Sequence, residues 1–501
     1  MSASQPNPVK QFSSPHVAVI GAGITGLTTA FYLLRAGYRV TVLEAREQAG
    51  GLATSFDFGP FHWDKFYHCI LTSDASLLGL IEDLDLTSEL TWTTTEVGFF
   101  SQNKLYRMTR PADLLAFPHL SLLDKVRFGM GTVYAARFCD GHGLEDVPLR
   151  DWVIRIFGEK LHREIWDPLL RCKLGELRDS ASAAFLHSTL KRLYSTREKG
   201  AEKKEKLGFV KGGYKVVLSR LVERIERLGG DLRYGVHLDR IESRDSKVWL
   251  HENGDRQRID SAVVTVPNRA AAALLPELPA AFHERLLAVK YLGMVCVVLL
   301  LRRPLSPFYV TNITQKARFT GIIEMTNLIG TKATHGYSLV YLPKYTVPSD
   351  PLFTMTDEEV WQEYSLDLFR MHPTLHSSDI VSRFVFRERA VQPLPTLRYS
   401  EVLPPMNTPM SGVFLANTSQ IVNDTLNNNI MTGIARKASE AVIRFHTEQA
   451  RECESTAGSR SAALHSPREG EIALVPSLLA DSMETNEAPE DRYGTTVDLT
   501  A

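Results

Sequence analysis

HVAVIGAGITGLTTAFYLLRAGYRVTVLEAR, residues 16–46, is the stretch that decides the fold of this chain. The β-branched apolar run at its start predicts a strand, and the apolar residues that follow at helical spacing predict a helix that ends near Gly37. The run YRVTVLE predicts a second strand. Two parallel strands joined by a helix within about 30 residues belong to an α/β sheet, so the sequence predicts the α/β class.

Three glycines stand between the first predicted strand and the helix, in the pattern GxGxxG. Gly21 allows a tight turn, Gly23 lets the backbone approach a pyrophosphate, and Gly26 lets the helix pack closely on the strand. The helix N-terminus offers N–H donors to phosphates. Glu44 ends the second strand, where a carboxylate can accept from ribose hydroxyls and would repel a 2′-phosphate. If the glycine-rich turn had only a structural role, the position of Glu44 at the end of the second strand would have to be a coincidence. The predicted dinucleotide-binding residues here are Gly21, Ala22, Gly23, Ile24, Thr25, Gly26 and Glu44.

The next residues, EAREQAGGLATSF (44–56), decide between FAD and NAD. They resemble the second fingerprint of the flavin amine oxidase superfamily, which includes relatives of protoporphyrinogen oxidase and phytoene desaturase and, more distantly, UDP-galactopyranose mutase. The resemblance implies FAD, with the arginine and the glycine pair along the diphosphate and the flavin. Two glycines permit close backbone approach, and an arginine can pair with phosphate. The residues that this fingerprint adds to the predicted site are Ala45, Arg46, Gly50, Gly51 and Leu52.

The resemblance extends over residues 16–446, through GFVKGGYKVVLSRL (208–221), LRYGVHLDRI (232–241) and the final strand, turn and helix. It implies that Val236 lies near the adenine. It also implies that the last helix, at Asn429, Ile430 and Met431, points its N-terminus at the flavin. Many relatives carry Gly-Asp after the last strand, where this chain has Ala416-Asn417. Asn417 is expected to bond a ribityl or phosphate oxygen without adding charge. No attachment motif is evident, so the flavin is expected to bind without a covalent link.

The predicted architecture has a Rossmann-like FAD-binding domain assembled from three segments, with a mixed α/β substrate-binding domain formed by the insertions between them. The ends of the chain are predicted to be a flexible N-terminus and a disordered tail, because the tail is rich in Ser, Glu, Ala and Pro. The FAD-binding segments are 16–90, 205–275 and 405–446, the substrate-binding segments are 91–204 and 276–404, and the ends are 1–15 and 447–501.

Few side chains near a flavin need to be catalytic, because the flavin takes the hydride and the protein supplies orientation and a dry pocket. FHWDKFYHCI (61–70) follows the glycine pair and is expected to bring Asp64, Tyr67 and His68 towards the ring. In the related mutases a histidine after an acid lies near the flavin, and imidazoles exchange protons near neutral pH. His68 and Asp64 are therefore the catalytic candidates. The alternatives are a buried structural histidine and an aspartate that caps a turn.

Composition describes an ordinary globular chain, with 44% hydrophobic and 23% charged residues and a formal net charge of −1. Nothing in the charge favours nucleic acid as a partner. The five cysteines lack metal-ligand spacing, which favours free thiols in a reducing compartment, so a cytoplasmic location is expected with peripheral membrane contact left open.

The favoured function is an FAD-dependent oxidoreductase that takes a hydride from an apolar, lipid-like or amine small molecule. Two alternatives stay open, because the same fold hosts several chemistries. One is a UDP-sugar mutase that uses reduced FAD, and the other is a flavin-binding protein without catalysis.

Overall fold

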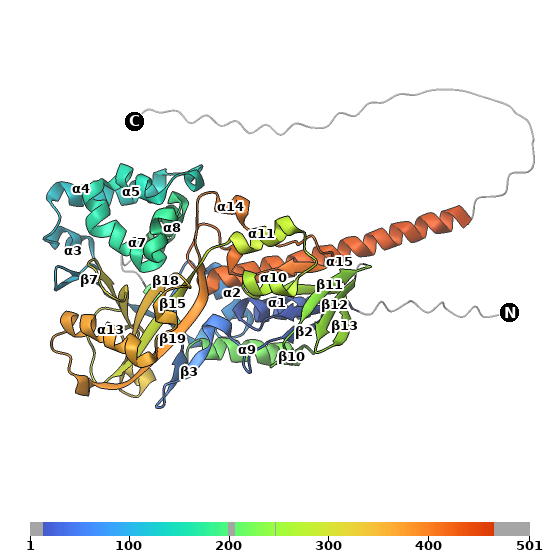
Figure 1. The fold of residues 1–501 in the computed structure, drawn as a ribbon, viewed down its shortest axis with the longest axis horizontal. Coiled ribbons are helices and arrows are strands. Elements are labelled where there is room, and N and C mark those ends of the chain that lie inside the picture. Colours follow the sequence, from blue (N-terminus) through green and yellow to red (C-terminus); the bar gives the residue numbers. More distant parts are fainter. Residues whose placement is uncertain (1–13, 199–205, 246, 465–501) are drawn as a thin grey trace, which may run out of the picture. The chain divides into compact units, whose positions relative to one another are not determined.

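A five-stranded parallel sheet contains the N-terminal motif (Figure 1). Neighbouring strands pair in parallel throughout, for example Val17 with Val40 on one side and with Ser261 on the other. The strands come from three separated parts of the chain, which confirms the predicted α/β class and the assembly of this sheet from three segments. The order is β10 (Asp231–Arg233), β2 (Arg39–Leu43), β1 (His16–Ile20), β14 (Ser261–Val264) and β20 (Val413–Leu415).

Alternate residues of β1 enter two different hydrophobic clusters, because successive side chains of a strand point to opposite faces. Val17 and Val19 pack with the helices α1 (Ile24–Arg35), α9 (Tyr214–Arg227) and α15 (Asn428–Leu464). Ala18 and Ile20 face the other way. Their cluster includes residues of an antiparallel sheet and of the two helices that follow β14. These elements are β11 (Arg240–Arg244), β12 (Lys247–Glu252), β13 (Asp255–Ile259), α10 (Asn268–Leu274) and α11 (Ala280–Ala288).

A seven-stranded mixed sheet lies in the part of the chain predicted to bind substrate. The apolar run MVCVVLLL (294–301) predicts a buried strand, and it lies in the long, buried strand β15 (Tyr291–Leu301) of this sheet. Cys296 and Val298 face the aromatic residues of the 56–66 region, whereas Val297 and Leu299 face helix α13 (Asp357–Met371). The strand order is β19 (Ile380–Pro393), β15, β18 (Ser338–Thr346), β17 (Gly321–Glu324), β16 (Val310–Ile313), β7 (Val97–Ser101) and β8 (Lys104–Arg107).

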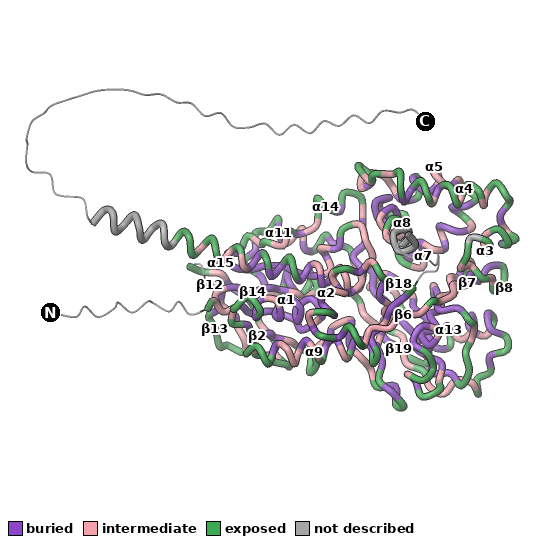
Figure 2. The backbone as a smooth tube through the Cα atoms, turned by 180° about the vertical axis from the view of Figure 1, so that it is seen from behind, coloured by how far each residue is buried: buried purple, intermediate pink, exposed green. Residues whose placement is uncertain are grey.

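A group of helices between residues 111 and 198 forms its own aromatic core, which contains Trp152, Phe157 and Trp166. These helices lie together in Figure 1, and Figure 2 shows α4 largely exposed. Helical spacing of the apolar residues in SLLDKVRFGMGTVYAARFC (121–139) predicts an amphipathic helix here. The structure has α4 followed by one wider turn at Tyr134–Phe138. The main helices are α3 (Pro111–Ala116), α4 (Leu122–Val133), α5 (Leu149–Phe157), α7 (Asp167–Leu174) and α8 (Ala183–Glu198).

This computed structural model describes residues 14–198, 206–245 and 247–464. The described residues up to Thr447 belong to one compact unit, and those from Glu448 to Leu464 belong to a second. Helix α15 continues to Leu464, beyond residue 447, where the disordered tail was predicted to start. The remainder of that predicted tail and most of the predicted N-terminus lie outside the described residues. In the described ranges, no helix combines the length and the apolar character needed to cross a membrane.

Burial of His372 at the end of α13 has a consequence for acid stability. The side chain is buried, its Nε2 has no hydrogen-bond partner among the described residues, and burial lowers its pKa to about 4. Because the folded protein keeps this imidazole neutral, its contribution to the free energy of unfolding is fully present above pH 6.5 and is lost as the pH falls towards 4. The free energy of unfolding is expected to fall by about 3 kcal/mol through this effect. His372→Leu should remove that part of the pH dependence in denaturant unfolding measured between pH 7 and 4. His142→Leu, which replaces an exposed histidine, should keep this pH dependence. The same dependence of the unfolding free energy on pH in the unmodified protein and in both variants would contradict the assignment.

Candidate functional site

Two glycines around the start of α1 exclude side chains, Gly21 in the turn after β1 and Gly26 in the first turn of the helix. Gly21 has φ +105°, a conformation that favours glycine, and a Cβ on Gly26 would lie 1.9 Å from the Gly21 carbonyl oxygen. Helix α1 begins at Ile24, and no side chain caps its N-terminus. The strand and the helix therefore approach as closely as the motif predicts, and the first N–H groups of α1 are left for an external acceptor.

A second glycine pair closes on the first turn. The backbone N–H of Gly50 donates to the carbonyl of Ala22 at 2.8 Å, and a Cβ on Gly51 would lie 3.3 Å from the Cα of Gly23. Gly50 and Gly51 have φ of +128° and +56°. Bare backbone from both motifs therefore meets beside the N-terminus of α1. Such a cradle suits a diphosphate, which needs close N–H donors and no intervening side chain.

The carboxylate of Glu44 is fixed at the end of β2. Oε2 accepts from the Ala22 N–H at 2.7 Å, and Oε1 accepts from the Arg46 N–H at 2.9 Å. Each oxygen keeps capacity for a further donor such as a ribose hydroxyl. The Val236 N–H donates to the Glu44 carbonyl at 3.0 Å, which holds Val236 beside this position. Val236 lies in the loop after β10 rather than in a strand, because β10 ends at Arg233.

Glu44→Ala is expected to lower the FAD content of the purified protein at least several-fold. The substitution removes the ribose acceptor and also frees the two N–H groups that shape the turn. Protein-bound flavin per chain, measured by absorbance after denaturation, reports the effect. Glu47→Ala is the matched control, since Glu47 is an exposed carboxylate three residues away that holds neither N–H group. Full FAD content in the Glu44 variant would remove Glu44 from the proposed site.

Three residues of the second fingerprint have different surroundings. Arg46 is exposed and forms an ion pair with Glu388 of β19 at 3.1 Å. Its predicted place along the diphosphate would require it to leave that partner. Ala45 is exposed, while Leu52 is half-buried against the aromatic residues near β4 (His62–Asp64).

Asn417 does not have the free side chain that was expected. Its amide nitrogen donates to the Val266 carbonyl at 2.7 Å and to Asn268 Oδ1 at 2.9 Å. Its amide oxygen accepts from the backbone N–H and the hydroxyl of Ser419. The side chain is buried and both amide hydrogens are used, so Asn417 holds the turn after β20 and has no donor left for a ribityl or phosphate oxygen.

The start of α15 is fixed by its own side chains. Asn427 Oδ1 accepts from the Ile430 N–H at 3.0 Å, and Asn429 Oδ1 accepts from the Leu77 N–H at 3.1 Å. Met431 is buried in the core under the parallel sheet. Asn428 is different, because its buried Nδ2 has no partner among the described residues. Asn428 thus has a buried, unused donor in this run, whereas the predicted site residues start at Asn429.

Asp64 and His68, the two catalytic candidates, lie beside each other. Asp64 Oδ1 accepts from the Tyr214 N–H at 2.8 Å and so caps α9, while Oδ2 lies 3.6 Å from His68 Nδ1. Asp64 is 2% exposed and His68 is 17% exposed. At 3.6 Å there is an ion-pair contact but no hydrogen bond, and His68 Nδ1 has no hydrogen-bond partner among the described residues. Asp64 therefore combines the cap and the histidine partner that the sequence left as alternatives.

Tyr214 and Asn428 complete this polar cluster, and the sequence did not single out either. The Tyr214 ring lies 4.9 Å from the His68 ring, and its hydroxyl lies near the Asn428 side chain without a hydrogen bond to it. Burial raises the pKa of Tyr214 well above its usual value, so the hydroxyl stays protonated. A Cβ on Gly213 would lie 2.8 Å from Asp64 Oδ1, which explains the glycine before α9. We call His68, Asp64, Tyr214 and Asn428 the His68 cluster.

The residues beside His68 add an aromatic wall and one cation. Tyr67 and Cys69 are half-buried, and burial raises the pKa of Cys69 to about 11, so this thiol is not a thiolate at neutral pH. Lys173 Nζ lies 5.8 Å from the centre of the Tyr67 ring and 5.7 Å from that of Tyr345. Within the described residues it has no carboxylate partner. An unpaired cation over two aromatic rings would attract an acidic group.

Two polar residues of the predicted substrate-binding segment 276–404 have their partners within the fold. Glu324 is fully buried and accepts from the N–H groups of Leu305 and Ser306, and burial raises its pKa. Arg398 is exposed and pairs with Asp146. These contacts leave neither side chain directed at the His68 cluster.

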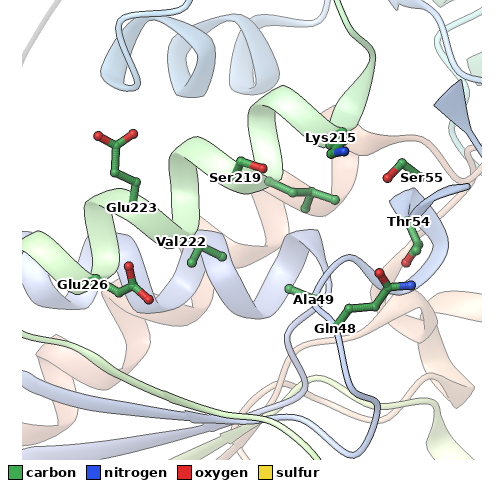
Figure 3. Close-up of a pocket in the computed structure, with 10 residues that line it drawn as sticks. Gln48, Ala49, Thr54, Ser55, Lys215, Ser219, Val222, Glu223 and Glu226 are labelled. Carbon is green, nitrogen blue, oxygen red and sulfur yellow. The ribbon is translucent and has the colours of Figure 1, made fainter. Parts of the chain in front are cut away.

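A cavity of about 320 Å³ lies elsewhere, between α9 and the loop at residues 48–55 (Figure 3). Lys215, Ser219, Glu223 and Glu226 of α9 line it together with Gln48 and Ala49 of the loop. None of the predicted cofactor-binding residues lines it. The cavity nevertheless adjoins the glycine cradle, because a Cβ on Gly50 would lie 2.8 Å from Thr54 and 2.9 Å from Leu218, which both line the cavity.

The model of the family described as flavin containing amine oxidoreductase matches residues 24–442. Coproporphyrinogen III oxidase of Bacillus subtilis is 25% identical over 303 residues, which cover 54% of this chain and 63% of that protein. The 15-cis-phytoene desaturase of Glycine max is 20% identical over 480 residues, which cover 88% of this chain and 81% of that protein. Putrescine oxidase bound to putrescine superposes with a TM-score of 0.65 at 18% identity, over 86% of this chain and 99% of the other. Reduced UDP-galactopyranose mutase superposes with a TM-score of 0.66 at 15% identity, over 86% of this chain and 96% of the other.

Proposed function

Because the chain belongs to the family of flavin-containing amine oxidoreductases, with FAD as its cofactor, we propose that it oxidises an organic small molecule by passing a hydride to that flavin. The observation that carries this proposal is the pairing of two features. One is the side-chain-free cradle at Gly21, Gly23, Gly50 and Gly51. The other is the His68 cluster, whose His68 follows Gly51 by 17 residues. The cradle supports placing the diphosphate there, and the short connection supports placing His68 near the reacting ring.

Bound FAD supplies the hydride acceptor, and the protein's side chains accept the proton and limit the access of water. Oxidation of the substrate releases one hydride and one proton. In this proposal His68 accepts the proton at Nε2, because its Nδ1 is buried and faces Asp64. Asp64 stabilises the imidazolium that forms, since its Oδ2 lies 3.6 Å away. Tyr214 and the aromatic wall limit the access of water.

The unpaired cation near Tyr67 bears on the substrate class. Lys173 would repel an ammonium group at that place and attract a carboxylate. A substrate with an apolar body and an acidic group therefore fits better than a diamine. Coproporphyrinogen, named by one relative, is a better first candidate than putrescine, named by another.

Oxygen uptake with coproporphyrinogen, phytoene and putrescine, each with the holoprotein in air, tests the substrate class. Turnover of an acidic substrate that falls in Lys173→Met with a raised KM supports the proposal. Turnover of putrescine alone would contradict the substrate class while leaving hydride transfer to FAD intact. Isomerisation of a UDP-sugar by the dithionite-reduced protein, without net oxidation, would instead support the mutase chemistry of the UDP-galactopyranose mutase neighbour.

A further inference from the structure

Helix α4 and the turn after it expose an unusual amount of apolar surface. Sixteen large hydrophobic residues are exposed in the described chain, and eight of them fall between residues 115 and 138. Leu123 is 77% exposed and Phe138 is 73% exposed. Contiguous apolar surface of this kind marks an interaction site, whereas scattered exposed residues do not. We call these eight residues the α4 face: Leu115, Leu122, Leu123, Val126, Met130, Val133, Tyr134 and Phe138.

The α4 face lies on the outer side of a well-anchored helix. Leu122, Val126, Met130 and Val133 follow one another at spacings of three or four residues, so they share one side of α4. The other side packs inward, because a Cβ on Gly131 would lie 2.7 Å from the Phe157 ring. Phe128 likewise stacks on Trp166 with ring centres 5.5 Å apart. A helix that already buries one side normally has a polar outer side, and α4 does not.

The start of the helix is firmly capped. Ser121 Oγ accepts from the Asp124 N–H, and Asp124 Oδ2 accepts from the Ser121 N–H at 2.9 Å. This reciprocal cap stabilises the first turn. The exposure of Leu122 and Leu123 is therefore a property of a formed helix and not of a frayed end.

The segment that carries the α4 face is basic. Residues 104–138 contain six basic and two acidic residues, a net charge of +4 in a chain whose total is −1. Both carboxylates are occupied as helix caps: Asp113 accepts from the Thr109 and Arg110 N–H groups, and Asp124 caps α4. Arg107 pairs with Glu96 at 3.0 Å, whereas Lys125 and Arg127 donate to backbone carbonyls and keep their charge. The basic residues are Lys104, Arg107, Arg110, Lys125, Arg127 and Arg137.

We propose that the α4 face docks on the surface of an anionic lipid bilayer. Its leucines, methionine and phenylalanine would enter the boundary between headgroups and acyl chains, and the surrounding lysines and arginines would approach the lipid phosphates. Charge complementarity favours this partner over a second copy of the chain. Self-association through this face would bring two surfaces of net positive charge together.

Flotation of the purified holoprotein with vesicles tests the proposal. Binding to phosphatidylcholine vesicles that contain phosphatidylserine is expected to exceed binding to pure phosphatidylcholine at least tenfold, and to weaken as salt is raised. Leu123→Asp and Phe138→Asp should each lower the vesicle partition coefficient about tenfold or more, because each removes one inserted apolar side chain. FAD content and the unfolding midpoint of each variant show that the fold is intact.

Leu366→Asp is the matched control, since Leu366 is a 62% exposed leucine on α13, outside the α4 face. Its partition coefficient should match that of the unmodified protein. The proposal is overturned if the protein does not bind anionic vesicles, or if Leu366→Asp loses as much binding as Leu123→Asp. It is also overturned if Leu123→Asp abolishes a dimer seen by light scattering while vesicle binding is absent. That result would assign the face to a second copy.

Discussion

Gly26→Ala is expected to yield protein without bound FAD and with a free energy of unfolding lowered by about 1–3 kcal/mol. The added Cβ would lie 1.9 Å from the Gly21 carbonyl oxygen, which is backbone and cannot swing aside. Relief requires α1 to move away from β1, and that movement displaces the N–H groups that face the diphosphate. Flavin absorbance per chain and denaturant unfolding measure the two effects.

Gly129→Ala is the control for Gly26→Ala. Gly129 is also a helical glycine, but a Cβ there meets no atom within 4 Å. It should keep its FAD and gain slightly in stability, since alanine is favoured over glycine inside a helix. A Gly26→Ala protein that retains stoichiometric FAD would show that the close contact between helix and strand is not needed for the cofactor.

His68→Ala is expected to retain FAD but to slow anaerobic reduction of the flavin by the substrate by about 10²- to 10⁴-fold, the usual contribution of a positioned proton acceptor. The side chain lies outside the glycine cradle, and its buried Nδ1 faces Asp64 at 3.6 Å. Stopped-flow absorbance at the flavin band gives the rate constant, with the FAD content determined on the same sample.

Two further variants separate the role of His68 from general damage. His62→Ala removes an exposed imidazole from the same segment and should leave the rate unchanged. Asp64→Asn can still accept from the Tyr214 N–H through its amide oxygen but no longer stabilises an imidazolium, so it should slow reduction while α9 stays capped. An unchanged rate in His68→Ala would make the cluster structural.

The parts of the fold that depend on local pattern could be predicted from sequence. The β1–α1–β2 unit follows from periodicity and from glycines whose reasons are steric, as the Gly26 contact shows. Asp64 and His68 are four residues apart, so their proximity also follows from one short segment.

Features that depend on contacts between distant segments could not be predicted. Asn417 was expected to face the cofactor, but its donors are used by Val266 and Asn268, about 150 residues earlier in the chain. Tyr214 and Asn428 join His68 only because the starts of α9 and α15 meet there. Periodicity likewise marked α4 as amphipathic without showing that apolar side chains would remain uncovered on its outer side.

An anaerobic absorbance titration of the purified protein tests the central claim most directly. The account predicts a flavin band that is bleached by one equivalent of an organic substrate, without dithionite, and that returns when oxygen or another acceptor is admitted. A chain purified without flavin, and unable to take it up from added FAD, would contradict the account, as would a flavin that no small-molecule substrate reduces.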